Sequence, residues 1–206
     1  MDKWWIIGIG FSAQLFFSGR LLIQWFLSEK QKQSITPLTF WWLSLGGAFL
    51  LFVYGYFRED FAIMLGQSLT YFIYIRNLQL QKQWDKLPKG IGVFLWIFPI
   101  FIVVYAYNNG QYDLDKLFRN EAIPLWLLLL GSIAQVIFTL RFVYQWIYAE
   151  KRKVSVLPTG FWLLSLIGAL LILTYAIIRK DIVLLLGHCM GIVVYTRNLM
   201  LIRKQQ

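Results

Sequence analysis

The sequence has 206 residues, of which 59% are hydrophobic and 15% charged, and its formal net charge is +10. Soluble domains carry about 45–50% apolar and about 25% charged residues, and a chain of this length has too much surface for its volume to hide so many apolar side chains from water. These values exclude an ordinary soluble domain and predict an integral membrane protein.

Seven apolar segments, each long enough for a membrane helix, follow one another along the chain. They span residues 4–27, 38–57, 61–80, 90–107, 123–148, 159–178 and 182–202. The first segment lacks a cleavage site of small residues, so we expect a retained helix and not a signal peptide. The predicted fold class is an all-α integral membrane protein with seven transmembrane helices.

The first three segments and the last three are copies of one unit. RLLIQWFLSEKQKQS at 20–34 returns as RFVYQWIYAEKRKVS at 141–155, a shift of 121 residues, and roughly 30 of about 76 aligned positions are identical. Because three is odd, a single extra helix lets both copies enter the membrane in the same direction, which predicts a 3+1+3 arrangement of parallel repeats. The predicted division is repeat 1 at 1–85, a linker at 86–121 that contains the central helix 90–107, and repeat 2 at 122–206.

Lysine and arginine gather on one side of this arrangement, which the positive-inside rule assigns to the cytoplasm. The residues are Lys30, Lys32, Lys82, Lys86, Lys89, Lys151, Arg152, Lys153, Arg203 and Lys204. We therefore expect the N-terminus outside, the C-terminus inside, and the tryptophans Trp25, Trp41, Trp146 and Trp162 in the inner aromatic belt. Attraction to anionic inner-leaflet lipid accounts for the positive charge, so no nucleic-acid partner is implied.

Polar residues recur at equal depth in the cytoplasmic part of both repeats. They are Arg20, Gln24, Arg76 and Asn77 in the first and Arg141, Gln145, Arg197 and Asn198 in the second. The nearest acids, Glu29 and Glu150, are expected in loops and not at this depth. Arginines without an internal counter-ion suit an anionic ligand, and guanidinium geometry favours phosphate or carboxylate. For Arg76 and Arg197, which are nearer the interface, snorkelling to lipid phosphates is an equal alternative.

A second polar set lies deeper in the predicted helices. It comprises Gln14, Gln135, Gln67 and His188. These side chains either hydrogen-bond neighbouring helices or line a substrate path. No metal-ligand, nucleophile or phosphate-loop motif is present, so we expect no metal and no cofactor, and the sequence offers no catalytic residue, although an enzyme is not excluded.

The pattern R-x-x-x-Q-W-x-x-x-E-K, then S-x-x-P-x-x-F-W-x-x-S-L-x-G, then Y-x-R-N-L occurs in both repeats. It resembles the lipid A biosynthesis N-terminal domain family, whose three-helix modules occur alone, doubled, or ahead of a lipid-A-disaccharide synthase. That family is similar to the SWEET and PQ-loop transporters, which share the 3+1+3 plan. The resemblance implies a bacterial inner membrane protein, and it does not imply sugar uptake because the paired Pro-Gln signature is missing.

Three functional hypotheses follow. The first is a transporter or flippase for a phosphate-bearing lipid or lipid-linked saccharide in envelope glycolipid biosynthesis, with the eight recurring polar residues at the head group. The second is a SWEET-like carrier of a sugar or carboxylate, which would depend on the deeper glutamines and the histidine. The third is a non-transporting subunit that presents lipid to a membrane glycosyltransferase.

Overall fold

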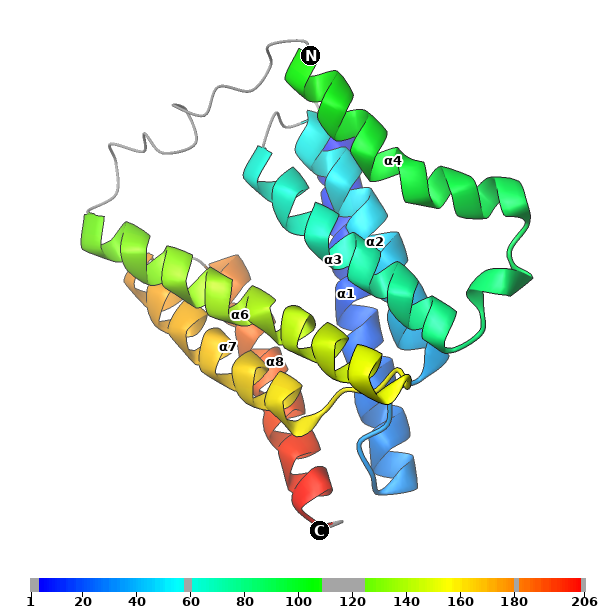
Figure 1. Ribbon diagram of the computed structural model, residues 1–206. Coiled ribbons are helices and arrows are strands. Elements are labelled where there is room, and N and C mark those ends of the chain that lie inside the picture. Colours follow the sequence, from blue (N-terminus) through cyan, green and yellow to red (C-terminus); the bar gives the residue numbers. More distant parts are fainter. Residues whose placement is uncertain (1–3, 58–60, 109–124, 180–181, 205–206) are drawn as a thin grey trace. The chain divides into compact units, whose positions relative to one another are not determined.

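A computed structural model describes residues 4–57, 61–108, 125–179 and 182–204 of the chain (Figure 1). These residues form long α-helices and one 3-10 turn, with no strand among them. The elements are α1 (Trp4–Gln31), α2 (Leu38–Phe57), α3 (Phe61–Leu80), η1 (Trp84–Lys86), α4 (Lys89–Asn108), α6 (Leu125–Arg152), α7 (Thr159–Arg179) and α8 (Ile182–Arg203). The predicted all-α class is confirmed, and every α-helix falls on a predicted apolar segment.

Three of these helices are long and apolar enough to cross a membrane, judged by length and composition over the described residues. They are α1, α2 and residues Thr159–Ile178 of α7. A span of about 20 apolar residues matches the hydrocarbon thickness of a bilayer. The helices therefore indicate association with a membrane.

The chain divides into two compact units that do not coincide with the sequence repeats. Unit 1 comprises Met1–Arg20 and Leu38–Asn120, and unit 2 comprises Leu21–Pro37 and Glu121–Gln206. Helix α1 contributes its first part to unit 1 and its last part to unit 2. The end of the repeat-1 helix is therefore packed among repeat-2 residues, whereas 109–121 of the predicted linker lie outside the described residues.

Glycines in unit 1 let helix α2 pack closely against aromatic rings of α1. A Cβ built on Gly46 would lie 2.7 Å from the Phe16 ring, and one on Gly47 would lie 2.9 Å from the Phe17 ring. In a membrane the hydrophobic effect does not drive helices together, so helices associate through close packing at small residues such as these. Helix α4 joins through aromatic contacts such as Phe49 with Phe98, whose ring centroids are 4.4 Å apart.

Unit 2 repeats this packing with a closer backbone contact. A Cβ built on Gly168 of α7 would lie 2.9 Å from both the Cα and the backbone nitrogen of Phe138 on α6. Gly131 similarly faces the ring of Tyr175. Helices α6 and α7, and α7 and α8, lie side by side in this unit (Figure 1).

One tryptophan of α2 and one of α7 are not exposed as an aromatic belt requires. Trp41 and Trp162 are both fully buried, because each indole packs against a tyrosine of the next helix, Tyr74 or Tyr195. The expectation that these two side chains lie at the membrane interface is therefore wrong.

Candidate anion-binding sites

A buried guanidinium sits among hydroxyls and aromatic rings in unit 1. The Arg20 Nη1 donates hydrogen bonds to the Ser44 hydroxyl at 2.7 Å and to the Tyr74 hydroxyl at 3.2 Å. The guanidinium carbon lies 4.7 Å from the centroid of the Phe17 ring and 5.2 Å from that of Phe40. We call this group of five residues the first cradle.

Unit 2 contains an equivalent second cradle. The Arg141 Nη1 donates to the Tyr195 hydroxyl at 3.3 Å, and the guanidinium carbon lies 3.4 Å from the Phe138 centroid and 5.7 Å from that of Phe161. Ser165 is buried at the position equivalent to Ser44. Both serines donate to the carbonyl of the residue four positions earlier, at 2.6 Å for Ser165 and 2.5 Å for Ser44. The buried environment of the arginine is thus built twice.

Each cradle borders a buried tryptophan ring. The Trp41 and Tyr74 ring centroids are 6.1 Å apart at 40°, and Trp162 and Tyr195 have the same distance and angle. Within the described residues, neither indole nitrogen has a hydrogen-bond partner. Buried donors are nearly always satisfied in proteins, so a donor without a partner among the described residues at both equivalent positions is unusual. The sequence did not reveal this feature, since the two tryptophans read as interfacial.

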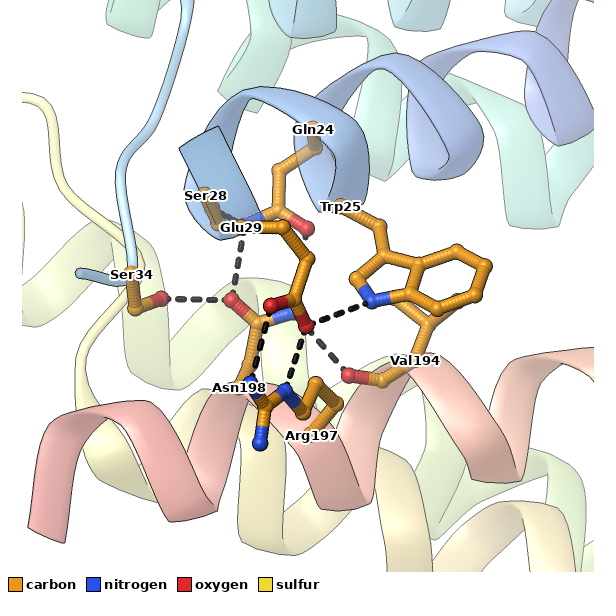
Figure 2. Close-up of polar contacts among 8 residues, drawn as sticks. All are labelled: Gln24, Trp25, Ser28, Glu29, Ser34, Val194, Arg197 and Asn198. Atoms are coloured by element: carbon orange, nitrogen blue, oxygen red, sulfur yellow. Dashed lines mark hydrogen bonds and ion pairs between the residues drawn. The ribbon is translucent and has the colours of Figure 1, made fainter. Parts of the chain in front are cut away.

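Gln24 and Asn198 form the centre of a buried polar network in unit 2 (Figure 2). The Gln24 Nε2 donates to the Asn198 Oδ1 at 2.8 Å, and the Asn198 Nδ2 donates back to the Gln24 Oε1 at 3.1 Å. Ser34 donates to the same Asn198 oxygen at 2.7 Å, and the Ser28 hydroxyl accepts from Gln24 at 2.9 Å and from the Ile35 backbone at 3.2 Å. The amides that were expected at a head group therefore bind each other across α1 and α8.

Gln145 occupies the equivalent position in the second repeat and shares part of this geometry. Gln24 and Gln145 each donate to a backbone carbonyl eleven residues on, that of Ile35 or Val156, at 3.0 Å. Ala149 replaces Ser28, however, so the second copy lacks that hydroxyl.

Arg197 is paired with an acid, contrary to the expectation from sequence. Its Nε and Nη2 donate to the two carboxylate oxygens of Glu29, the second at 2.9 Å, and the Trp25 indole donates to the Glu29 Oε1 at 3.1 Å (Figure 2). Helix α1 continues to Gln31, so Glu29 lies on the helix and not in a loop. The prediction that the arginines lack an internal counter-ion is therefore wrong for Arg197.

The other expected head-group residues, Arg76 and Asn77, lie on α3. Arg76 is half-buried and donates to the Gln79 side chain at 3.1 Å. Asn77 is fully buried and donates to the Ile73 carbonyl at 2.9 Å, as Asn198 does to that of Val194.

The four residues expected to line a path have different surroundings. Gln14 and Gln135 are exposed beside exposed apolar residues, Leu15 and Val136. Gln67 is half-buried, and His188 is half-buried with its ring edge against Phe138 at 5.0 Å. Their role as path-lining residues stays a prediction.

Comparison with known families assigns both repeats. Residues 9–79 and 130–200 each match the Lipid A Biosynthesis N-terminal domain. The chain belongs to this family. The two matches carry the two cradles at corresponding places.

Three relatives that span almost the whole chain carry the same printed name, lipid-A-disaccharide synthase. Those of Chlamydia muridarum, Chlamydia felis and Chlamydia pneumoniae are 34%, 31% and 32% identical to this chain over 95%, 96% and 96% of its length. The alignments cover 34%, 33% and 33% of those proteins, so this chain spans about a third of their length. No solved structure is significantly similar to the chain.

Proposed function

We propose that this chain is a membrane module of lipid A-type glycolipid biosynthesis that binds a phosphate-bearing lipid. The duplicated cradle carries the proposal. Each copy brings together a buried arginine and a tyrosine hydroxyl beside a buried tryptophan, whose indole N–H has no acceptor among the described residues. The guanidinium, the tyrosine hydroxyl and the indole are hydrogen-bond donors, and a phosphate group has several oxygens that accept from such donors.

The energetics of the buried arginines favour an anionic ligand. An arginine at the membrane centre costs about 2.5–3.5 kcal/mol on insertion scales, and a desolvated cation–π contact returns about 2 kcal/mol. Arg20 and Arg141 have such aromatic contacts. A bound phosphate would add charge-assisted hydrogen bonds at each site, which are roughly twice as strong as neutral ones.

The membrane arrangement that we propose has seven spans in a SWEET-like 3+1+3 order, with parallel repeats in a bacterial inner membrane and the C-terminus in the cytoplasm. One contact within unit 2 supports the parallel repeats. The Leu157 backbone donates to the Thr36 hydroxyl at 3.0 Å, and these two residues occupy equivalent positions. Contact between equivalent positions is what a two-fold relation produces near its axis.

The module's role is to hold the lipid for a membrane glycosyltransferase. Support comes from the relatives named lipid-A-disaccharide synthase, in which the matching region is about a third of a longer chain. Transport of the lipid across the bilayer is the second candidate, and the 3+1+3 pattern of parallel repeats favours it because transporters use that plan.

Lipid binding is tested by native mass spectrometry of the purified protein beside an Arg20→Gln/Arg141→Gln double variant. We expect a phosphate-bearing lipid to co-purify with the wild type and to be lost from the variant. The matched control is Lys30→Gln/Lys151→Gln, which removes two charges from exposed equivalent positions and should retain the lipid. Equal lipid on all three proteins would overturn the proposal and favour a small-solute carrier.

A proteoliposome assay separates the two candidate roles. A fluorescent phosphate-bearing lipid in the inner leaflet stays there if the module only presents lipid. Movement to the outer leaflet that depends on Arg20 and Arg141 would instead establish transport.

A further inference from the structure

The Glu29–Arg197 pair has the form of an occupied anion site. Both carboxylate oxygens accept from one edge of the guanidinium, Nε and Nη2. This edge-on, two-point contact is the one that arginine also makes with phosphate. The Trp25 indole adds a third donor to the same carboxylate.

The surroundings would hold these donors in place without Glu29. Asn198, next to Arg197, is bound to Gln24 by a reciprocal pair of amide hydrogen bonds, and Gln24 is bound to Ser28, next to Glu29. These three side chains are buried. The ends of α1 and α8 are therefore fixed to each other by contacts that do not include the ion pair.

The pair is open to the surroundings, unlike the two cradles. The Arg197 and Glu29 side chains are 36% and 35% exposed, whereas Arg20 and Arg141 are buried. Glu29 and Arg197 also lie within the last two turns of their helices. A lipid phosphate could therefore reach this position from the interface, and partly exposed ion pairs are weak enough to be exchanged.

We propose that Arg197 and Trp25 form a third anion site, in addition to the two cradles, for the phosphate of a lipid head group, and that Glu29 occupies this site as an intramolecular competitor. The inference rests on the proposed binding of phosphate-bearing lipid, and it adds residues and a control element to it. Incoming phosphate replaces the carboxylate at the guanidinium edge, and Glu29 turns outward to water. The lipid thus has a receiving position at the helix ends, separate from the cradles.

The test measures binding of dioctanoyl phosphatidic acid to the full chain in detergent by native mass spectrometry. Glu29→Gln should tighten binding about five-fold, because the competing charge is worth no more than a partly exposed ion pair. Adding Arg197→Gln should abolish that gain. Asp85→Asn, which removes one negative charge from an exposed residue of unit 1, should leave the dissociation constant unchanged.

A second variant covers the case in which Glu29→Gln fails to fold. Trp25→Phe keeps an aromatic side chain and removes the indole donor, so it should weaken phosphatidic acid binding about two- to three-fold, as the loss of one hydrogen bond does. Inorganic phosphate at ten times the lipid concentration should not displace the lipid. Displacement would identify free phosphate as the ligand and overturn the lipid assignment.

The remaining outcomes separate this inference from the proposed function. If Glu29→Gln binds as the wild type does while Arg20→Gln/Arg141→Gln loses the lipid, the third site is wrong and the cradles stand. If Glu29→Gln tightens binding but the Arg20→Gln/Arg141→Gln variant still binds fully, the third site stands and the cradles fail. If no protein prefers phosphatidic acid to phosphatidylcholine, both are overturned.

Discussion

Arg20 and Arg141 have nearly the same surroundings in the two repeats, whereas the residues two turns later on their helices have different contacts. Each arginine donates to a tyrosine hydroxyl, at 3.2 and 3.3 Å, and is ringed by aromatic side chains. Two turns later, Ser28 binds both Gln24 and the Ile35 backbone. The equivalent Ala149 has no hydroxyl to do so.

This difference distinguishes the contacts that both copies share from the one contact that only the first copy makes. The buried arginine, the tyrosine and the glutamine-to-carbonyl bond occur in both copies, so they belong to the three-helix module itself. The Ser28 hydroxyl belongs to the first copy only. Substitutions at equivalent positions of the two repeats therefore test whether contacts with the same geometry also contribute equally to the free energy of unfolding.

Gly168 and Gly47 should give the largest contrast between the copies. A Cβ at Gly168 meets the Phe138 backbone, which cannot move without shifting a helix, whereas a Cβ at Gly47 meets mainly the Phe17 ring. We expect Gly168→Ala to cost about 3 kcal/mol in the free energy of unfolding and Gly47→Ala about 1 kcal/mol, the range of overpacking. Denaturant unfolding in detergent micelles measures both.

The control for this pair is Gly8→Ala, because a Cβ there has nothing within 4 Å. It should be neutral or stabilise the protein by up to about 1 kcal/mol through helix propensity. Equal losses at Gly47 and Gly168 would show that the two helix contacts are equally tight.

Removal of the Gln24 amide should have the next largest effect. Gln24→Leu leaves the Asn198 amide and the Ser28 hydroxyl without their partner in a buried place. Unsatisfied buried groups cost about 1–3 kcal/mol, so we expect a loss of about 2 kcal/mol in the same unfolding assay.

Ser28→Ala is the matched change, because it gives the first copy the residue that the second already has. It should cost about 1 kcal/mol, the net value of a typical hydrogen bond. A loss as large as that of Gln24→Leu would mean that Ser28, and not the amide pair, holds the network together.

Much of the fold was predictable from the sequence, because apolar length and an exact repeat spacing locate helices well. The segment expected at 38–57 is α2 at Leu38–Phe57, and that at 61–80 is α3 at Phe61–Leu80. The end of α1 was missed because hydropathy falls after Leu27, although Ser28–Gln31 continue as helix. Glutamate, lysine and glutamine are good helix formers, and that signal would have placed Glu29 on the helix.

The candidate sites were predictable only in part. The repeat singled out Arg20, Arg141, Gln24 and Asn198, but it could not tell that Gln24 and Asn198 bind each other, since they come from different repeats. It also could not distinguish a buried tryptophan from an interfacial one. Burial depends on which face of α2 meets α3. The apolar periodicity of membrane helices is too weak to predict that face.

Lys32 and Lys153 should give the smallest effect, and it should be a gain. Both follow a helix end with positive φ, 52° and 54°, a conformation that glycine adopts without steric cost. Lys32→Gly should stabilise the protein by about 0.5–1 kcal/mol. Lys153→Gly should stabilise the protein by about 0.3 kcal/mol less, because a surface ion pair would be lost. In that pair the Lys153 Nζ lies 2.9 Å from the Glu150 carboxylate.

Substitution of the helical residue Lys30 by glycine is expected to change stability in the opposite direction. Lys30→Gly places glycine in the last turn of α1 and should destabilise by up to about 1 kcal/mol. If Lys32→Gly also destabilised, the lysine side chain itself would be holding the segment that carries Ser34 and Ile35 onto α8. In that case the backbone hydrogen bond from the Gln33 nitrogen to the Ser28 carbonyl, at 3.1 Å, would contribute less to holding this segment than its geometry implies. A gain at Lys32 larger than at Lys153 would instead mean that the two copies end this helix by the same backbone geometry and differ only in the ion pair at the surface.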